Sequence, residues 1–253
     1  MVPAAERPPR IAVVIPARNE AESVAAVACK CREVLARYPQ VRVVVADNAS
    51  ADGTAAAARG AGAEVVPAPT VGYGAACLAA VAAVEGWADL LVFLDADGSS
   101  APEEIPALLA PLTEGRADLA LGYRTNPRHM TLPQRWGTRL AVALVNRLWG
   151  TGYRDMGPFR ALSAAAFRRL QMRDRTWGWT IEMQVRARQT GLRVVEVPVS
   201  WLPRSAGRSK ISGTVSGVLR AGLRILWTIA RLYFMEHRIF VRKQTDTTGS
   251  ASP

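Results

Sequence analysis

Two aspartates separated by one residue, Asp95 and Asp97 in the segment FLDADGSS, are the clearest chemical feature of the sequence. They directly follow an apolar run over residues 90–94, which is typical of a buried strand. Because two neighbouring carboxylates disfavour each other's ionisation, the pair indicates a bound cation or polar ligand. Paired oxygen ligands suit Mg²⁺ or Mn²⁺, and either ion can bridge the phosphate oxygens of a nucleotide. The alternative for this motif taken alone is an ordinary strand-to-loop turn.

Three further segments place polar or flexible residues after apolar runs: VVIPARNE at 13–20, ADNASADGT at 46–54 and VGYGAA at 71–76. Arg18 and Glu20 offer charged groups in the first segment, and Asp47 in the second could accept hydrogen bonds from a nucleoside base or ribose. The glycines of the third segment would let the backbone approach a ligand closely. The alternatives are a polar strand-to-helix turn in the first segment and a helix N-cap by Ser50 or Asp52 in the second.

The order of these four segments resembles that of the family 2 inverting glycosyltransferases of GT-A fold, and within them the branch similar to dolichyl-phosphate mannose synthase. The resemblance spans roughly residues 10–235 and continues through GYR at 122–124, RDMGPFRA at 154–161, WTIEMQVRARQTGLRVVEVPVSW at 179–201 and RSAGRSKISG at 204–213. It implies a metal-dependent enzyme that transfers a hexose, with inversion, from a nucleotide-sugar of the GDP-mannose or UDP-glucose type. The implied acceptor is a polyprenyl (dolichyl-like) phosphate.

Each candidate site residue takes its role from this resemblance. The donor pocket would contain Pro16, Arg18, Glu20, Asp47, Gly74 and Asp95. The metal, Mg²⁺ or Mn²⁺, would be held by Asp95, Asp97 and Ser99. The catalytic set would be Asp97, Arg124, Asp155 and Glu182, of which the last two would face the sugar and the acceptor. The acceptor phosphate would bind Arg135, Arg204, Ser209 and Lys210.

Two positions depart from the pattern of the resembled branch. Where the mannose synthases commonly carry a glutamine that also ligates the metal, this sequence has Ser99. The third protein ligand would therefore be weaker or replaced by water. Asn48 stands where many relatives carry a second aspartate.

The chemical nature of the acceptor decides what Asp155 must do. The oxygen of a phosphate monoester is already anionic at neutral pH, so Asp155 would only need to orient other groups. A hydroxyl acceptor would need a carboxylate base, and Asp155 is then the first candidate. A glycosyltransferase that acts on a soluble hydroxyl acceptor is therefore one alternative function, and a sugar-nucleotide-binding pseudoenzyme is another.

Short apolar runs alternate with helix-length, alanine-rich segments in the first half of the chain. We expect strands at 11–15, 41–46, 64–67, 90–94 and 119–122, and helices at 21–38, 54–60 and 75–85. Such alternation is typical of an α/β fold with a mostly parallel sheet and helices on both faces, as in the GT-A (Rossmann-like) fold. The pattern continues with helices at 131–149 and 180–189, a loop at 150–160 and a strand at 193–201. One catalytic domain would cover residues 1–212, and its ligands would bind at the carboxyl ends of the strands.

Residues 213–240 have the pattern of an amphipathic helix, and residues 241–253 that of a polar, disordered tail. At ~100° per residue, four arginines of this helix fall within about 40° of one another. They are Arg220, Arg224, Arg231 and Arg238. Together with apolar residues on the other faces, this stripe favours a helix in the membrane interface. The alternative is a helix that packs on the catalytic domain with its arginines in water.

Composition and charge narrow the possible partners. The chain of 253 residues has a net charge of +11, but residues 1–115 carry 8 basic and 14 acidic side chains whereas residues 116–253 carry 24 and 7. An acidic first half suits a metal site, and a basic second half suits phosphates or an anionic membrane surface.

The sequence contains no recognisable nucleic-acid-binding module, no secretory signal and no uncharged run long enough to span a bilayer. Three cysteines favour a reducing compartment. We expect a cytoplasmic protein in peripheral contact with the inner face of the cell membrane.

Overall fold

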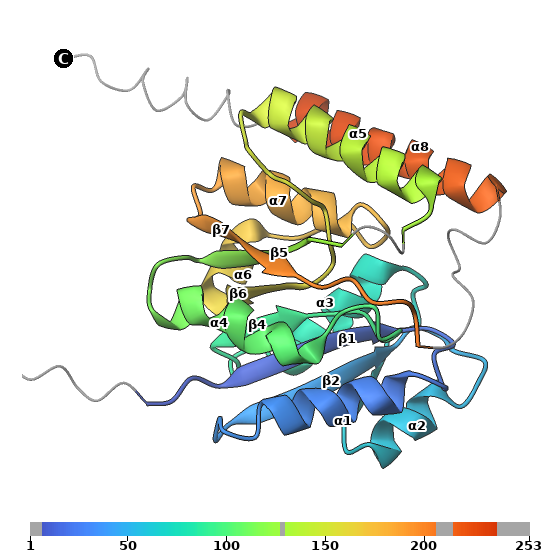
Figure 1. Ribbon diagram of the computed structural model, residues 1–253, viewed down its shortest axis with the longest axis vertical. Coiled ribbons are helices and arrows are strands. Elements are labelled where there is room, and N and C mark those ends of the chain that lie inside the picture. The colour runs from blue at the N-terminus through green and yellow to red at the C-terminus, as the bar shows by residue number, and fades with distance from the viewer. Residues whose placement is uncertain (1–6, 127–129, 206–214, 237–253) are drawn as a thin grey trace, which may run out of the picture.

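The computed structural model describes residues 7–126, 130–205 and 215–236 of the chain (Figure 1). Seven strands form one sheet in the order β3-β2-β1-β4-β6-β5-β7. The strands are β1 (Ile11–Ala17), β2 (Val41–Asp47), β3 (Glu64–Pro67), β4 (Leu90–Phe93), β5 (Leu119–Arg124), β6 (Arg160–Ser163) and β7 (Val194–Val199). Pairing is parallel except where β6 joins β4 and β5. The predicted, mostly parallel sheet is confirmed, whereas β6 lies just beyond the predicted loop and was not expected as a strand.

The described residues also form eight α-helices. They are α1 (Val24–Val34), α2 (Thr54–Gly60), α3 (Tyr73–Ala83), α4 (Ile105–Thr113), α5 (Leu132–Trp149), α6 (Ala164–Leu170), α7 (Trp179–Gln189) and α8 (Val215–Arg231). A short 3₁₀ turn (Pro102–Glu104) precedes α4, and a π-helical turn (Leu232–Glu236) follows α8. The predicted C-terminal helix is therefore present from 215 onward, while the predicted tail at 241–253 lies outside the described residues.

Helices cover both faces of the sheet, as the sequence predicts. Ile11, Val13 and Ile15 of β1 pack with α1, α2 and α4 on one face. Ala12 and Val14 of the same strand pack with α3, α6 and α7 on the other face. Strands buried on both faces read as continuous apolar runs rather than as alternating ones, which explains why β1, β2 and β4 were recognisable from the sequence.

The parallel strands bring their carboxyl ends to one edge of the sheet. Ala17 at the end of β1 pairs with Asp47 at the end of β2. On the other side of β1, Phe93 at the end of β4 pairs with Val14, so the loop that carries Asp95 starts at the same edge. The segments expected to carry chemistry therefore converge there.

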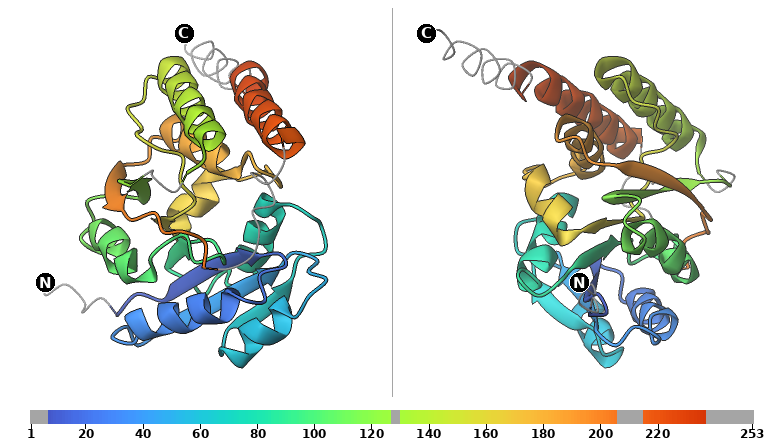
Figure 2. Two further views of the ribbon diagram at one scale, coloured as in Figure 1. Left: turned by 45° about the vertical axis from the view of Figure 1, so that its right-hand side comes forward. Right: turned by 90° about the vertical axis from the view of Figure 1, so that its left-hand side faces the viewer.

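A pair of helices forms an outer layer on one side of the molecule. α5 and α8 lie side by side, and both contact α7 (Figures 1 and 2). Both helices begin on the side at which β1 and β2 end, at the right of Figure 1. Within the described part of the chain, every helix is too short or too polar to cross a membrane.

Candidate active site

The guanidinium group of Arg204, which follows β7, joins two of the strand-end loops. Its Nη1 atom donates to Asp97 Oδ2 at 2.6 Å, and its Nη2 atom donates to the two Glu20 carboxylate oxygens at 2.8 and 2.9 Å. Glu20 follows β1 and Asp97 follows β4, so three residues far apart in the sequence meet at one edge of the sheet. Residues expected to serve the donor, the metal and the acceptor phosphate thus lie in one cluster.

The segment that carries Arg204 is fixed onto the aspartate loop. The backbone N–H of Ser205 donates to the Asp97 carbonyl at 3.0 Å, and the Ser205 hydroxyl donates to the same oxygen at 3.1 Å. Gly98 between the two loops adopts φ +75°, and a Cβ atom there would lie 2.7 Å from Ser205 Oγ. Both the conformation and the close approach require glycine at this position.

Two buried oxygen atoms near Asp97 lack a hydrogen-bond partner among the described residues, namely Asp95 Oδ1 and Ser99 Oγ. Since buried polar atoms are normally paired, unpaired oxygens at a strand end indicate a ligand. Burial, and next the negative charge of Asp97, raise the pKa of Asp95 to about 7. A bound divalent cation would favour both ionised carboxylates and so reverse this effect. These oxygens therefore fit the ligands of Mg²⁺ or Mn²⁺.

The site offers a small set of protein ligands. The described residues contain no group of three or more histidine, cysteine, aspartate or glutamate side chains placed to hold a metal. Asp95 and Asp97 would act with the Ser99 hydroxyl, and the Ser99 N–H holds Asp97 Oδ1 at 2.9 Å. Mg²⁺ usually keeps several waters and binds through one or two carboxylates plus substrate phosphates. A site with two carboxylates suits an ion that arrives with a diphosphate.

Arg124 and Asp155 form a buried, bidentate ion pair. Arg124 Nε and Nη2 donate to the two Asp155 oxygens, each at 2.6 Å. The carboxylate also accepts the Arg124 N–H at 3.0 Å and the Met156 N–H at 2.7 Å. The guanidinium carbon lies 4.9 Å from the ring centroid of Trp201. Asp155 accepts four hydrogen bonds here, so in this arrangement it orients Arg124 and is poorly placed to accept a proton from a substrate.

Asn48 holds the loop that follows β3. Its Nδ2 atom donates to the carbonyls of Ala68 and Thr70, both at 2.8 Å, and its Oδ1 atom accepts the Gly72 N–H at 2.8 Å. An aspartate could not make the two donated bonds. Beside it, Asp47 Oδ1 is buried and has no partner among the described residues, so Asp47 is open to a ligand.

The first two strand-end loops are tied together at the outer side of the site. Asn19 N–H donates to Ser50 Oγ at 3.0 Å, and Ala51 N–H donates to Asn19 Oδ1 at 2.8 Å. The N-cap of α2 is Gly53, neither Ser50 nor Asp52, although Asp52 accepts the Thr54 N–H at 3.0 Å just before the helix. The expected nucleoside residues lie at this edge, with Pro16 opposite Ala46 in the strand register and Arg18 exposed.

Gly74, expected near the donor, contacts another loop of the protein. A Cβ atom at Gly74 would lie 2.0 Å from the Asp174 carbonyl oxygen, and one at Gly72 would lie 2.1 Å from that of Arg175. The Gly74 N–H donates to the Thr176 carbonyl at 3.3 Å. One close approach that these glycines permit is therefore to residues 174–176, and contact of Gly74 with the donor stays a prediction.

Glu182 does not join the strand-end cluster, which differs from its expected place facing the sugar. Its side chain is fully buried, and Oε2 accepts the N–H groups of Arg173 and Asp174 at 2.9 and 2.6 Å. Oε1 accepts Arg186 Nε at 3.0 Å. A fully buried carboxylate must be satisfied by such donors, so Glu182 shapes the loop before α7 instead of facing a sugar.

Of the remaining residues expected to bind the acceptor, the structure describes Arg135. Arg135 lies half-buried near the start of α5, and no ion pair joins it to another described residue. Ser209 and Lys210 lie outside the described residues.

Two residues that the sequence reasoning did not single out lie close to the site, the half-buried Tyr73 and the buried Arg160. The Tyr73 hydroxyl hydrogen-bonds with Asp95 and so opposes the rise in its pKa that burial causes. Arg160 donates from Nη1 to the Thr180 carbonyl at 3.2 Å and from Nη2 to that of Gly157. Burial lowers the pKa of Arg160 to about 10. Tyr73 lies within the motif VGYGAA and Arg160 within RDMGPFRA. The motifs do not show what these side chains contact, and the fold does.

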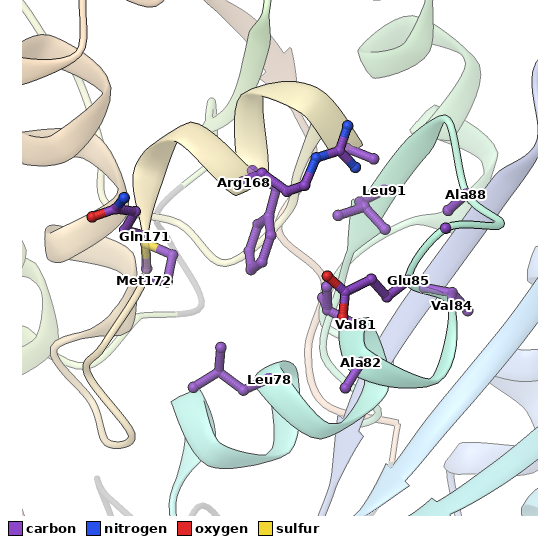
Figure 3. Close-up of a pocket in the computed structure, with 13 residues that line it drawn as sticks. Leu78, Val81, Ala82, Val84, Glu85, Ala88, Leu91, Arg168, Gln171 and Met172 are labelled. Atoms are coloured by element: carbon purple, nitrogen blue, oxygen red, sulfur yellow. The ribbon is translucent and has the colours of Figure 1, made fainter.

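A hollow of ≈ 250 Å³ lies elsewhere, between α3 and α6 (Figure 3). Its lining is largely apolar and includes Leu78, Leu91 and Met172. Glu85 and Arg168 are the charged residues of the lining (Figure 3). It offers few groups that could bind a diphosphate, so the strand-end cluster remains the candidate site.

A family profile and curated relatives agree on the family to which the chain belongs. The profile of glycosyl transferase family 2 matches residues 12–178. An uncharacterized glycosyltransferase of Mycobacterium tuberculosis is 38% identical over 216 residues, which cover 83% of this chain and 94% of that protein. The undecaprenyl-phosphate mannosyltransferase of Micrococcus luteus is 32% identical over 240 residues, which cover 86% of this chain and 96% of that enzyme.

A solved structure supports the fold. Glucosyl-3-phosphoglycerate synthase of Mycobacterium tuberculosis, in complex with Mn²⁺, UDP and glucosyl-3-phosphoglycerate, aligns with a TM-score of 0.72 at 24% identity. The alignment covers 89% of this chain and 80% of that one. At this identity the likeness shows the fold, which is GT-A. With the profile match and the two relatives, it leads to one conclusion: the chain belongs to glycosyl transferase family 2 and is a glycosyltransferase.

Proposed function

We propose that this glycosyltransferase transfers a hexose from a nucleotide-sugar to a polyprenyl phosphate, with inversion at C1 of the sugar. The reaction would require Mg²⁺ or Mn²⁺. The observation that carries the proposal is the strand-end cluster, in which Arg204, Glu20 and Asp97 meet near the unpaired oxygens of Asp95 and Ser99. The name of the Micrococcus relative supports the lipid phosphate, and the Mn²⁺ and UDP of the solved neighbour support the donor and the metal.

The donor would bind along the carboxyl ends of β1, β2 and β4. Asp47 and the loop after β1 would meet the nucleoside, and Asp95, Asp97 and Ser99 would hold the metal. A divalent ion bound there would neutralise the charge that develops on the leaving diphosphate. Arg124, held in place by Asp155, would add fixed positive charge to the same region.

The state of Asp155 favours a phosphate acceptor. A hydroxyl acceptor needs a base that removes its proton, but Asp155 already accepts four hydrogen bonds in the structure. The oxygen of a phosphate monoester is anionic and needs orientation and charge neutralisation only. Arg204 could supply both once it leaves Asp97 and Glu20, with Arg135, Ser209 and Lys210 as further proposed contacts.

A soluble acceptor is the second candidate. The solved neighbour holds glucosyl-3-phosphoglycerate, the product of transfer to a small phosphorylated metabolite. The same strand-end cluster could serve such a molecule if Asp155 were released from Arg124 and acted as base. We place the protein in the cytoplasm at the inner face of the membrane, in keeping with the lipid acceptor, and assign it no nucleic-acid partner.

A transfer assay with both acceptors tests the proposal. Purified protein is incubated with labelled UDP- and GDP-sugars and Mn²⁺, together with undecaprenyl phosphate in detergent or with 3-phosphoglycerate. We expect label in the organic phase with the lipid phosphate and none in the 3-phosphoglycerate product. Label that enters only the water-soluble product would contradict the lipid acceptor while leaving the transferase assignment intact.

A further inference from the structure

Arg224 and Arg231 of α8 face the body of the protein. This contact argues against the alternative in which the arginines of this helix lie in water. Arg224 Nε donates to Thr176 Oγ1 at 3.0 Å. Arg231 Nη2 lies 3.6 Å from Asp174 Oδ2 and 3.8 Å from Glu182 Oε1. The physical reason is that these two buried carboxylates need a positive partner.

The exposed face of α8 is largely apolar. Trp227 borders the arginine side, because the guanidinium carbons of Arg224 and Arg231 lie 4.7 and 5.3 Å from its ring centroid. Ile229 and Leu232 are buried against the core, whereas Leu223, Leu226 and Trp227 are exposed. Phe234, in the π-helical turn, continues the exposed row. Such a face is unusual for a helix in contact with water alone.

Helix α5, next to α8, has a similar outer face. Leu132, Trp136 and Leu140 are spaced four residues apart, so they share one side of the helix. All three are exposed, and with the four residues of α8 and its turn they range from 40% to 68% exposed. Seven large exposed apolar side chains on two neighbouring elements are more than single surface residues would account for.

Charge and position indicate what this surface contacts. Neither α5 nor α8 contains an aspartate or glutamate. Arg139 and Arg147 of α5 are exposed, whereas Arg224 and Arg231 of α8 contact the body of the protein. A surface of tryptophan and leucine flanked by arginine is typical of the interface of an anionic bilayer. Both helices start on the side at which the parallel strands end (Figure 1).

We propose that Leu132, Trp136, Leu140, Leu223, Leu226, Trp227 and Phe234 form one membrane-binding surface, the α5–α8 surface, which takes an anionic lipid bilayer as its partner. The ion pairs of Arg231 with Asp174 and Glu182 fix α8 with its apolar side outward. The use of this surface rests on the proposed function, because a polyprenyl phosphate would reach the site from the bilayer.

Vesicle binding tests the surface without donor or acceptor. Wild-type protein is sedimented with vesicles of phosphatidylglycerol and phosphatidylcholine, and with vesicles of phosphatidylcholine alone. The double variant Trp136→Glu/Trp227→Glu is compared with Ala26→Glu/Ala56→Glu, which makes the same charge change at exposed positions of α1 and α2. We expect the tryptophan variant to bind anionic vesicles about tenfold or more weakly than wild type, and the alanine variant to bind nearly as wild type does.

Fluorescence provides a readout that does not depend on an acidic substitution. Brominated lipids in the vesicles should quench wild-type tryptophan emission. The milder Trp136→Phe/Trp227→Phe variant should lose most of the quenching while it still binds. Unchanged quenching in this variant would overturn the placement of these two residues in the bilayer.

Two results would overturn the proposal as a whole. One is equal vesicle binding by the two glutamate variants. The other is a stable wild-type dimer that is lost in the Trp136→Glu/Trp227→Glu variant and kept in the alanine-site variant. A second copy of the chain, not a bilayer, would then cover the surface. Failure of the proposed function looks different, because wild type would bind vesicles yet transfer no sugar. If only the surface is wrong, transfer to a short-chain, water-soluble prenyl phosphate should proceed in every variant.

Discussion

At the scale of residues, the pKa of Asp95 should make metal binding depend on pH. Burial and the charge of Asp97 raise its pKa from 3.8 to about 7 in the metal-free protein. Between these values the folded state keeps a proton that the unfolded state has released, so the stability of the metal-free protein falls as pH rises through this range. A metal ion must displace that proton when it binds.

The apparent affinity for Mn²⁺ should therefore depend on pH in a defined direction. We expect it to rise up to about tenfold per pH unit below 7 and to level off above, because one proton is released per ion bound. Counting free Mn²⁺ by electron paramagnetic resonance across this range measures it directly. Asp95→Asn should bind Mn²⁺ weakly at every pH. An affinity for wild type that is flat across the same range would contradict a buried, protonated Asp95.

Asp155 offers a second test at this scale. Replacement by asparagine keeps the size of the side chain but weakens the bidentate pair with Arg124. If Asp155 only positions Arg124, Asp155→Asn should lower kcat/KM by about 10- to 100-fold, because misplaced catalytic groups cost rate in this range. The remaining activity should keep the pH profile of the wild type. Near-total loss of turnover with donor binding kept would instead identify Asp155 as the base for a hydroxyl acceptor.

The sequence indicated the roles of some single residues and not of others. Asp95 and Asp97 were recognisable because their types and spacing suit a cation whatever surrounds them. Glu182 was misplaced, since a motif names a residue but does not show that backbone N–H groups saturate its carboxylate. Asn48 was noted only as a departure, and its hydrogen bonds to three backbone groups became visible once β2 and the loop after β3 were placed together.

At the scale of elements, α8 and the loop before α7 stabilise each other. Asp174 and Glu182 are 1% and 0% exposed at their side chains, and Arg231 lies beside both. The same loop packs on Gly72 and Gly74 at the start of α3. The position of α8 is thus connected through residues 174–176 to the loops at the strand ends.

Removal of Arg231 should destabilise this connection. We expect Arg231→Met to lower the free energy of unfolding by about 1–3 kcal/mol, because two buried carboxylates lose positive charge. Arg139→Met on the exposed face of α5 serves as the matched control and should change the value by less than about 0.5 kcal/mol. Urea unfolding followed by circular dichroism measures both. Equal values for the two variants would show that the Arg231 pairs contribute nothing to the docking of α8.

The sequence predicted that residues after 213 form an amphipathic helix, but not which face meets the protein. Hydrophobic periodicity assumes that the apolar side faces inward. Here Asp174 and Glu182 draw the arginine side inward, and the leucine and tryptophan side remains outside. The partners that decide this, Asp174 and Glu182, lie 57 and 49 residues before Arg231 in the sequence, beyond the reach of any local pattern.

At the scale of the whole molecule, the parallel part of the sheet was predictable and the antiparallel strand was not. β1, β2 and β4 are long or fully apolar runs followed by polar residues, and they read as strands without knowledge of the fold. β6 has four residues, and its pairing with β4 and β5 depends on tertiary placement. The charge asymmetry of the chain has a place in this architecture: the acids proposed to bind the metal come from the first half, and the arginines of α5 and α8 come from the second.

The central claim is that this strand-end site joins a nucleotide-sugar to a lipid phosphate through a metal held by Asp95 and Asp97. The most direct measurement supplies undecaprenyl phosphate and 3-phosphoglycerate together in one reaction with the labelled donor, and follows both products with and without Mn²⁺ and in Asp97→Asn. We expect the label in an organic-phase hexosyl phosphate diester, lost on chelation and in the variant. Label in the lipid product that persists without metal and in Asp97→Asn, or label in the aqueous product alone, would contradict the account.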